Sequence, residues 1–213
     1  RKIAYERGVD VAALAADGTK VTREMVEAAP AAVASGAGAY RQPNSGQVKL
    51  TTMRRIIAQR MLQSKQEIPG YYLHMDVDLT DLMDARRKLN AKGDVKVSIN
   101  DYFLVACGRA LAEFPAVNSR WLDGGIEYRG ECNVGLAVAL EEGLIVPVVR
   151  NIEQKHLTQV AADSRSLIEK ARGKKLLPEE FEGGSMTISN LGGYSVKHFI
   201  PVINPGESCI MGL

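Results

Sequence analysis

The sequence GGSMTISNLGG, residues 183–193, places a short β-prone run between two pairs of glycines. Side chains alternate between the two faces of a strand, so Thr187 and Ser189 are predicted on one face, opposite Met186 and Ile188. A hydroxyl held where a strand breaks into a Gly-rich turn can point into a cleft and donate a hydrogen bond to a developing oxyanion. Ser189 is therefore the candidate catalytic residue. The pattern alone favours the plainer interpretation, a serine on the polar face of a strand before a turn.

The rest of the sequence alternates segments with helical and with strand periodicity. The predicted helices run from Thr52 to a stop at Pro69-Gly70, from Thr80 to Leu89, from Ser98 to Phe114 and from Leu157 to Arg172. The predicted strands are 71–79, 126–128, 133–140, 144–149, 186–190 and 208–213. Hairpin-like returns between neighbouring strands favour an α+β fold over a regular βαβ winding.

Individual residues set the ends of the predicted helices. Thr52 and Thr80 are the expected N-caps, and Ser98 with Asp101 resembles a capping box in which Asp replaces the usual Glu. Gly173 is the expected left-handed cap that ends the last helix.

Two features of the central strands bear on how they pack. Pro147 cannot donate a ladder hydrogen bond, so it predicts a sheet edge or a bulge. Gly135, Ala137 and Ala139 form a face of small residues, which permits close approach by another backbone or a ligand.

Composition divides the chain into three parts. Residues 1–29 predict a small helical module, in which Thr22 is the N-cap of a helix from Arg23 to Ala28. Residues 30–47 are rich in Ala, Gly and Pro and have almost no large apolar side chains, which predicts a flexible linker. Residues 48–213 are the expected globular domain.

The overall composition argues against several classes of function. A net charge of +2, from 27 Lys and Arg against 25 Asp and Glu, gives no reason to expect nucleic-acid binding. No run of about 18 apolar residues occurs, so no membrane span is expected. A content of 46% hydrophobic residues in 213 is enough for a sizeable buried core.

The cysteines and histidines form no recognisable metal or catalytic motif. Three cysteines without C-x-x-C spacing argue against a disulfide framework or a zinc site and favour a reducing compartment. None of His74, His156 and His198 belongs to an H-E-x-x-H motif, and we interpret each as a surface or structural residue. No metal is expected, and no P-loop or G-x-G-x-x-G pattern assigns cofactor-binding residues.

Several ordered blocks resemble the acyltransferase core of 2-oxo-acid dehydrogenase complexes, a family that moves acyl groups between dihydrolipoamide and coenzyme A. Besides residues 183–193 they are TMRRIIAQRM (52–61), IPGYYLHMDV (68–77), VSIND (97–101), FPAVNS (114–119), GLIVPV (143–148) and INP (203–205). Residues 1–29 resemble, less closely, the peripheral subunit-binding domain of the same family. An unrelated structural α+β protein would have to match all of these blocks, in this order, by coincidence.

The resemblance implies a fold like chloramphenicol acetyltransferase, a mixed sheet with helices. It also implies a homotrimer with an active site in a channel between its subunits, and this homotrimer is expected to build a larger core. Coenzyme A and the dihydrolipoyl arm enter from opposite ends, and the lipoyl group is carried on another domain. A histidine takes the thiol proton, the thiolate attacks the thioester, and a hydroxyl, matched here by Ser189, stabilises the oxyanion. No covalent acyl-enzyme is implied.

Details of the resemblance refine the expected function. The sequence Ser-Asn-Leu-Gly at 189–192 is more similar to that of acetyltransferases, such as those of pyruvate dehydrogenase complexes, than to that of succinyltransferases. The family's His-Arg-x-x-Asp-Gly motif is expected after Leu213, so the base is not among these residues. Gly70 stands where many relatives have His.

The resemblance also implies partners and a compartment. Partner dehydrogenase subunits are expected to bind residues 1–29, although Lys20 stands near the usual Arg and the loop at Leu14–Gly18 is short. Bacterial cytoplasm or mitochondrial matrix is the expected location. A non-catalytic core or binding subunit of such a complex is the alternative function.

Overall fold

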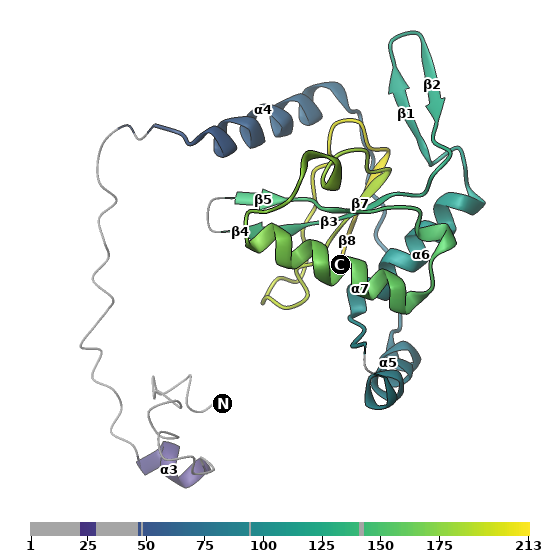
Figure 1. Cartoon of the computed structure of the whole chain (residues 1–213). Coiled ribbons are helices and arrows are strands. Elements are labelled where there is room, and N and C mark those ends of the chain that lie inside the picture. Colours follow the sequence, from purple (N-terminus) through teal and green to yellow (C-terminus); the bar gives the residue numbers. More distant parts are fainter. Residues whose placement is uncertain (1–21, 29–46, 48, 94, 141–142) are drawn as a thin grey trace. The chain divides into compact units, whose positions relative to one another are not determined.

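The computed structural model describes residues 22–28, 47, 49–93, 95–140 and 143–213 (Figure 1). The chain forms two compact units, Arg1–Lys49 and Leu50–Leu213. In the first unit, helix α3 (Arg23–Ala28) is capped as predicted, because the Thr22 Oγ1 accepts the Met25 N–H at 3.3 Å. The rest of the predicted 1–29 module and the predicted linker up to residue 46 lie outside the described residues.

A four-stranded mixed sheet organises the second unit, in the order β6-β3-β7-β8. Its strands are β3 (Val134–Leu136), β6 (Val148–Val149), β7 (Met186–Ser189) and β8 (Cys209–Gly212). Strands β3, β7 and β8 run parallel to one another, whereas β6 is antiparallel to β3. The predicted α+β architecture with a mixed sheet is therefore confirmed.

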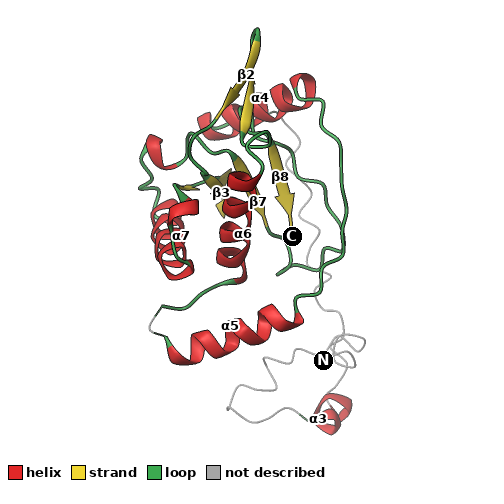
Figure 2. Cartoon of the chain, turned by 90° about the vertical axis from the view of Figure 1, so that its right-hand side faces the viewer, coloured by secondary structure: helices red, strands yellow, loops and turns green. Residues whose placement is uncertain are grey.

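Helices α6 (Ile99–Glu113) and α7 (Leu157–Arg172) pack against one face of this sheet (Figures 1 and 2). Met186 and Ile188 point from β7 into the core with them, as the strand alternation predicted. The other core residues include Leu104, Cys107 and Leu111 of α6, Val160 of α7, and Val134, Leu136 and Val149 of the neighbouring strands.

The capping box at the start of α6 is confirmed, and it also joins the two helices. The Asp101 carboxylate accepts the Ser98 N–H at 2.7 Å, and the Ser98 Oγ accepts the Asp101 N–H at 3.3 Å. The same buried carboxylate accepts a hydrogen bond from the Ser164 Oγ of α7 at 2.6 Å. One side chain thus caps α6 and ties it to α7.

The two long strands predicted at 133–140 and 144–149 are each divided into two. Beyond β3, the chain continues as β4 (Val138–Leu140), which pairs with β5 (Gly143–Ile145) in a separate two-stranded sheet. Pro147 lies between β5 and β6, and its carbonyl accepts the Leu136 N–H at 2.9 Å. Since β6 is a sheet edge, the interpretation of Pro147 as an edge or bulge residue is confirmed.

A hairpin that the sequence only half predicted projects from the unit (Figure 1). It consists of β1 (Ser119–Leu122) and β2 (Gly125–Tyr128), of which only β2 was expected. Gly124 takes a φ of +91° in the two-residue turn, a conformation that glycine adopts without strain. Because this Asp-Gly turn sets the pairing, β1 forms without an alternating apolar pattern of its own.

Two predicted caps are displaced by one residue. Helix α4 (Thr52–Glu67) is capped by Thr51, whose Oγ1 accepts the Arg54 N–H at 3.3 Å, and not by Thr52. Helix α5 (Thr80–Lys92) includes Thr80 as its first residue. Its N-cap is Leu79, which makes no side-chain capping hydrogen bond, and the Asp78 carboxylate accepts hydrogen bonds from the Thr80 N–H and hydroxyl at 2.8 and 2.6 Å.

The predicted cap at Gly173 is also wrong. Gly173 is right-handed, with φ −77° and ψ −1°, and the left-handed residue is Lys174, with φ +55°. The Lys175 N–H closes the helix end on the Lys170 carbonyl at 2.8 Å. Short 3-10 turns, η1 (Ile152–Gln154) and η2 (Pro178–Glu180), flank α7 in the sequence.

The predicted strand at 71–79 does not form in this structure. The segment has no strand partner among the described residues, and its apolar side chains are exposed, reaching 83% at Leu73 and 86% at Met75. The alternating pattern was correctly identified, but a strand requires a neighbour to complete its hydrogen bonds. The pattern therefore marks a segment suited to pairing and does not itself supply the partner.

Candidate functional site around Ser189

Ser189 is the last residue of β7, beside the last residues of β8. It lies opposite Gly212 in the parallel register, and its carbonyl accepts the Leu213 N–H at 2.9 Å. Leu191 then donates its N–H to the Leu213 carbonyl at 2.8 Å. These two backbone bonds hold the strand end on both sides of Asn190.

The Ser189 side chain is half-buried, and its hydroxyl has no hydrogen-bond partner among the described residues. Thr187, on the same face of β7, is fully buried. A hydroxyl that is positioned by its backbone but not engaged with a neighbour remains available to donate to a ligand oxygen. The role of Ser189 as an oxyanion donor stays a prediction.

Asn190 braces the turn that follows Ser189. Its Nδ2 donates to the Asn100 Oδ1 at 2.6 Å, and its Oδ1 accepts the Gly192 N–H at 2.7 Å. Asn100 belongs to the first turn of α6, so the strand end is tied to that helix. The sequence analysis did not identify this pair as part of the site, because no local signal connects residues 90 positions apart.

A polar cluster lies two residues before Ser189 on the same strand face. The Thr187 Oγ1 donates to the Glu207 Oε2 at 2.7 Å and accepts from the Asn204 Nδ2 at 3.0 Å. The same Asn204 amide lies 3.3 Å from the Glu207 Oε1. Glu207 was not singled out from the sequence, although Asn204 lies in a quoted block.

Glycine at position 135 is required by this packing. A Cβ added to Gly135 would lie 2.5 Å from the Val146 Cγ1 and 2.9 Å from the Thr187 Oγ1, which is closer than side chains tolerate. A close approach to this small-residue face was predicted for a backbone or a ligand. At Gly135 the nearest atoms instead belong to the side chains of Val146 and Thr187.

The electrostatics of the cluster depend on burial. Desolvation raises the pKa of Glu207, while hydrogen bonds from Thr187 and Asn204 and the charge of Arg129 oppose that shift. Arg129 donates to the Gly183 carbonyl at 2.9 Å and to the Gly206 carbonyl at 2.8 Å. Burial lowers the pKa of this guanidinium. One cation thus joins the loops that flank β7 and β8.

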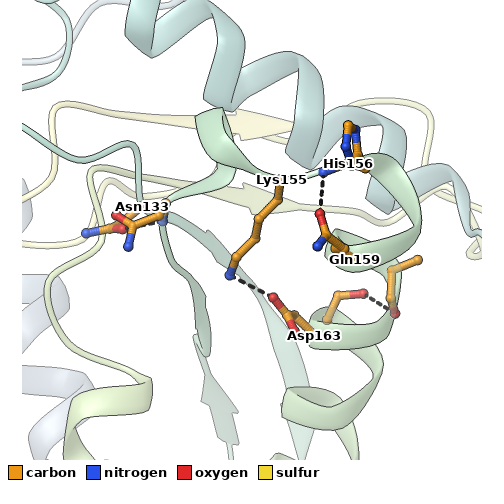
Figure 3. A network of polar contacts seen from close by, with 8 residues as sticks. Asn133, Lys155, His156, Gln159 and Asp163 are labelled. Carbon is orange, nitrogen blue, oxygen red and sulfur yellow. Dashed lines mark hydrogen bonds and ion pairs between the residues drawn. The ribbon is translucent and has the colours of Figure 1, made fainter.

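The histidines lie away from this arrangement of hydrogen bonds. The exposed rings of His74 and His198 stack with their centroids 4.6 Å apart, at an angle of 55°. His156 begins α7, where its N–H donates to the Gln159 Oε1 at 2.9 Å, next to the Lys155–Asp163 ion pair (Figure 3). None of the three histidines is hydrogen-bonded to Ser189 in the described part of the chain.

The cysteines have the properties of buried thiols. Burial raises the pKa of Cys107 to about 12 and also raises the pKa of Cys132 and Cys209. Because the thiolate is the nucleophile, these shifts make a nucleophilic role unfavourable at neutral pH.

Neither the cavities nor the groups of possible metal ligands in the described residues indicate a second site. One cavity of about 240 Å³ lies between α4 and the segment 201–203, and another of about 410 Å³ lies between β6, α7 and η2. Ser189 lines neither of them. Among the residues that the structure describes, no three His, Cys, Asp or Glu side chains gather as metal ligands, and no helix has both the length and the apolarity to cross a bilayer.

Comparison with known proteins shows which family has this architecture. The family model "2-oxoacid dehydrogenases acyltransferase (catalytic domain)" matches residues 42–213. The dihydrolipoyllysine-residue acetyltransferase component of the Rickettsia bellii pyruvate dehydrogenase complex is 44% identical over 165 residues, which are 76% of this chain and 40% of that protein. The mitochondrial counterpart from Caenorhabditis elegans is 37% identical and matches 100% of this chain and 44% of its own length. The chain thus spans about two fifths of the length of these curated relatives.

Solved structures agree with the fold. The dihydrolipoamide acetyltransferase of Azotobacter vinelandii, studied for the role of one serine, one histidine and one asparagine in its catalytic mechanism, superposes with a TM-score of 0.75 at 34% identity. The match covers 78% of this chain and 71% of that one. The cubic core of a pyruvate dehydrogenase multienzyme complex gives a TM-score of 0.76 at 32% identity, covering 81% of this chain and 73% of that one.

Proposed function

The chain belongs to the 2-oxoacid dehydrogenase acyltransferase family, whose catalytic-domain model matches residues 42–213, and from this premise we propose that it transfers an acetyl group between a dihydrolipoyl arm and coenzyme A. The acyl group is inferred from the relatives, which are acetyltransferase components of pyruvate dehydrogenase complexes. Both thiol compounds are substrates in this proposal, and no metal takes part.

The position of Ser189 is the observation that carries the proposal. Its hydroxyl lies half-buried at the end of β7, without a hydrogen-bond partner among the described residues. A thioester carbonyl placed against it would gain negative charge on its oxygen as a thiolate attacks the carbonyl carbon. The Ser189 O–H would donate a hydrogen bond to that oxygen, which lowers the barrier if the bond is stronger in the transition state than in the bound substrate.

The remaining steps require proton transfer but no bond to the enzyme. A base takes the proton of the attacking thiol, the tetrahedral adduct collapses, and the other sulfur leaves with a proton. The 213 residues contain no His-Arg-x-x-Asp-Gly motif, so we assign this proton transfer to no residue in this sequence. Ser189 acts as a hydrogen-bond donor and does not become acylated.

Assembly into a homotrimer that builds a larger core is part of the proposal. The aromatic and apolar side chains from Tyr71 to Val77 are from 55% to 86% exposed. Soluble monomers rarely leave such contiguous apolar surface uncovered, so a further polypeptide segment is expected to cover it. One relative of similar fold is the cubic core of a multienzyme complex, in line with a multi-copy assembly.

Partner dehydrogenases are proposed to bind through residues 1–29, of which only Thr22 to Ala28 are described. The proposed location is the bacterial cytoplasm or the mitochondrial matrix, because the relatives come from bacteria and from mitochondria.

An acyl-transfer assay tests the proposal. The full-length natural protein is given acetyl-coenzyme A and dihydrolipoamide, and formation of S-acetyl-dihydrolipoamide and free coenzyme A is followed together. Equal amounts of both products support transfer. Release of coenzyme A without acetylated dihydrolipoamide would indicate hydrolysis and reject it. A protein that assembles into a core but forms neither product would be the non-catalytic core subunit instead.

A further inference from the structure

We propose that Glu207 is a positioning residue of the acyl-transfer site, which acts through Thr187 to hold β7 and the Ser189 hydroxyl in place. The role assigned to Ser189 rests on the proposed function above. The mechanical part of the inference, that Glu207 fixes the strand, rests on hydrogen bonds and packing alone.

The first step is the direct link between the turn and the strand. The Glu207 carboxylate accepts the Thr187 hydroxyl at 2.7 Å, and Asn204 lies within 3.3 Å of both side chains. Thr187 is fully buried, so its hydroxyl needs a partner inside the protein. A hydrogen bond to a carboxylate is stronger than one between neutral groups, and Glu207 is the acceptor that the structure provides.

The second step is the anchoring of Glu207 itself. Arg129 donates to the carbonyls of Gly183 and Gly206, which precede β7 and Glu207 respectively. The guanidinium also contributes an attractive charge to the Glu207 carboxylate. The carboxylate is therefore held in a turn that is tied to the start of the same strand it binds.

The third step is the lack of free space. A Cβ added to Gly184 would lie 3.0 Å from the Glu207 Oε1, and one added to Gly135 would lie 2.9 Å from the Thr187 Oγ1. The cluster is thus closely packed by Gly135 of β3 and by Gly184, two residues before β7. This packing restrains Thr187, and Thr187 and Ser189 are two residues apart in the same strand register.

The final step concerns the backbone hydrogen bonds at the two ends of β7. The Ser208 N–H donates to the Ser185 carbonyl at 3.1 Å, and the Leu213 N–H donates to the Ser189 carbonyl at 2.9 Å. The Thr187–Glu207 bond lies between these two points. Because a displacement on the order of 1 Å can cost about 10²-fold in rate, a looser strand would reduce the benefit of the Ser189 donor without removing it.

The experiment compares Thr187→Val, Thr187→Ser, Glu207→Ala and Glu207→Gln in the full-length protein. We expect Thr187→Val and Glu207→Ala to lower kcat about 10-fold while KM for both substrates stays within about twofold. Thr187→Ser keeps the hydroxyl, and Glu207→Gln keeps an accepting oxygen, so both should retain most of kcat. Ser208→Ala is the matched control, since its hydroxyl contacts the Ser185 carbonyl at 3.3 Å and not Thr187.

Amide hydrogen exchange at Leu213 is the second readout, because that N–H is bonded to the Ser189 carbonyl. Faster exchange in Thr187→Val and Glu207→Ala, but not in Ser208→Ala, is expected. Unchanged kcat and exchange in Thr187→Val, or equal losses in Glu207→Gln and Glu207→Ala, would overturn the inference. If the wild-type protein has no transferase activity but exchange is still faster in Thr187→Val and Glu207→Ala, the positioning role is kept and the proposed function is rejected.

Discussion

The Asn190 Nδ2 donates a hydrogen bond to the Asn100 Oδ1 at 2.6 Å and thereby joins the end of β7 to the first turn of α6. The residue that precedes Asn190 is Ser189, so this bond sets the direction in which the chain leaves the candidate oxyanion donor. The backbone bond from Leu213 to the Ser189 carbonyl fixes the same point from the β8 side. Ser189 is thus positioned by contacts of its neighbours, while its own hydroxyl has no hydrogen-bond partner among the residues that the structure describes.

Replacement of Ser189 by alanine tests its proposed role directly. We expect Ser189→Ala to lower kcat about 10²–10³-fold, with little change in the affinity for coenzyme A, because only an interaction made in the transition state is lost. Steady-state kinetics with acetyl-coenzyme A and dihydrolipoamide would measure this. An unchanged kcat would remove Ser189 from the mechanism.

Loss of the Asn190–Asn100 bond should affect both stability and rate. Asn100→Ala leaves the Asn190 amide without this acceptor, and we expect about 1 kcal/mol lower free energy of unfolding and a reduced kcat. Urea unfolding and steady-state kinetics on the same preparation would show both effects. Asn100→Asp retains an acceptor oxygen and should recover most of the rate; if it does not, the hydrogen bond is not the reason for the loss.

Glycine at 135 is expected to be intolerant of even one added methyl group. Gly135→Ala would bring a Cβ within 2.5 Å of the Val146 side chain, so we expect destabilisation of about 1–3 kcal/mol. Gly125→Ala is the matched control, because a Cβ there meets nothing within 4 Å. Equal midpoints for the two variants in chemical denaturation would contradict this account of the packing.

The raised pKa of Glu207 predicts a pH-dependent contribution to stability. Between the value in the unfolded chain, about 4.3, and the raised folded value, the folded protein keeps a proton that the unfolded chain has lost. The free energy of unfolding therefore falls as the pH rises through this window. The facing groups are Arg129, whose charge opposes the shift, and Cys209, whose own pKa is raised mainly by burial and also by the charge of Glu207.

Glu207→Gln removes this titration. Relative to the natural protein, its free energy of unfolding should become larger as the pH increases above the unfolded value, since glutamine has no cost of ionisation in the buried site. Urea unfolding at several pH values measures the difference. A difference that stays constant with pH would mean that Glu207 ionises as easily in the folded protein as in the unfolded chain.

Sequence patterns predicted the elements with local signals well. The Ser98–Asp101 capping box, the strand at 186–189 and the role of Pro147 all follow from residues close together in the chain, and all are confirmed. The predictions were wrong where the conformation of a segment depended on an adjacent residue or on a partner strand. The N-caps are Thr51 and Leu79 and not the predicted Thr52 and Thr80, and the 71–79 segment has no partner strand among the described residues.

In the candidate site, too, the sequence predicted local features but not long-range contacts. Ser189 was identified from its place at the end of a β-prone run, and its side of the strand was predicted from alternation. The contacts that hold it were not, because Asn100 and Glu207 are remote from β7 in sequence or lie in a loop without a distinctive pattern.

The sequence by itself determined the local conformation, the face on which each β7 side chain lies and the family to which the blocks belong. These depend on hydrogen bonds and periodicities that span a few residues. Only the tertiary structure decided that Thr187 meets Glu207, that Asn190 meets Asn100 and that Leu213 lies beside Ser189. Such contacts depend on how helices and strands pack around one core, and packing is a property of the whole sheet and its covering helices.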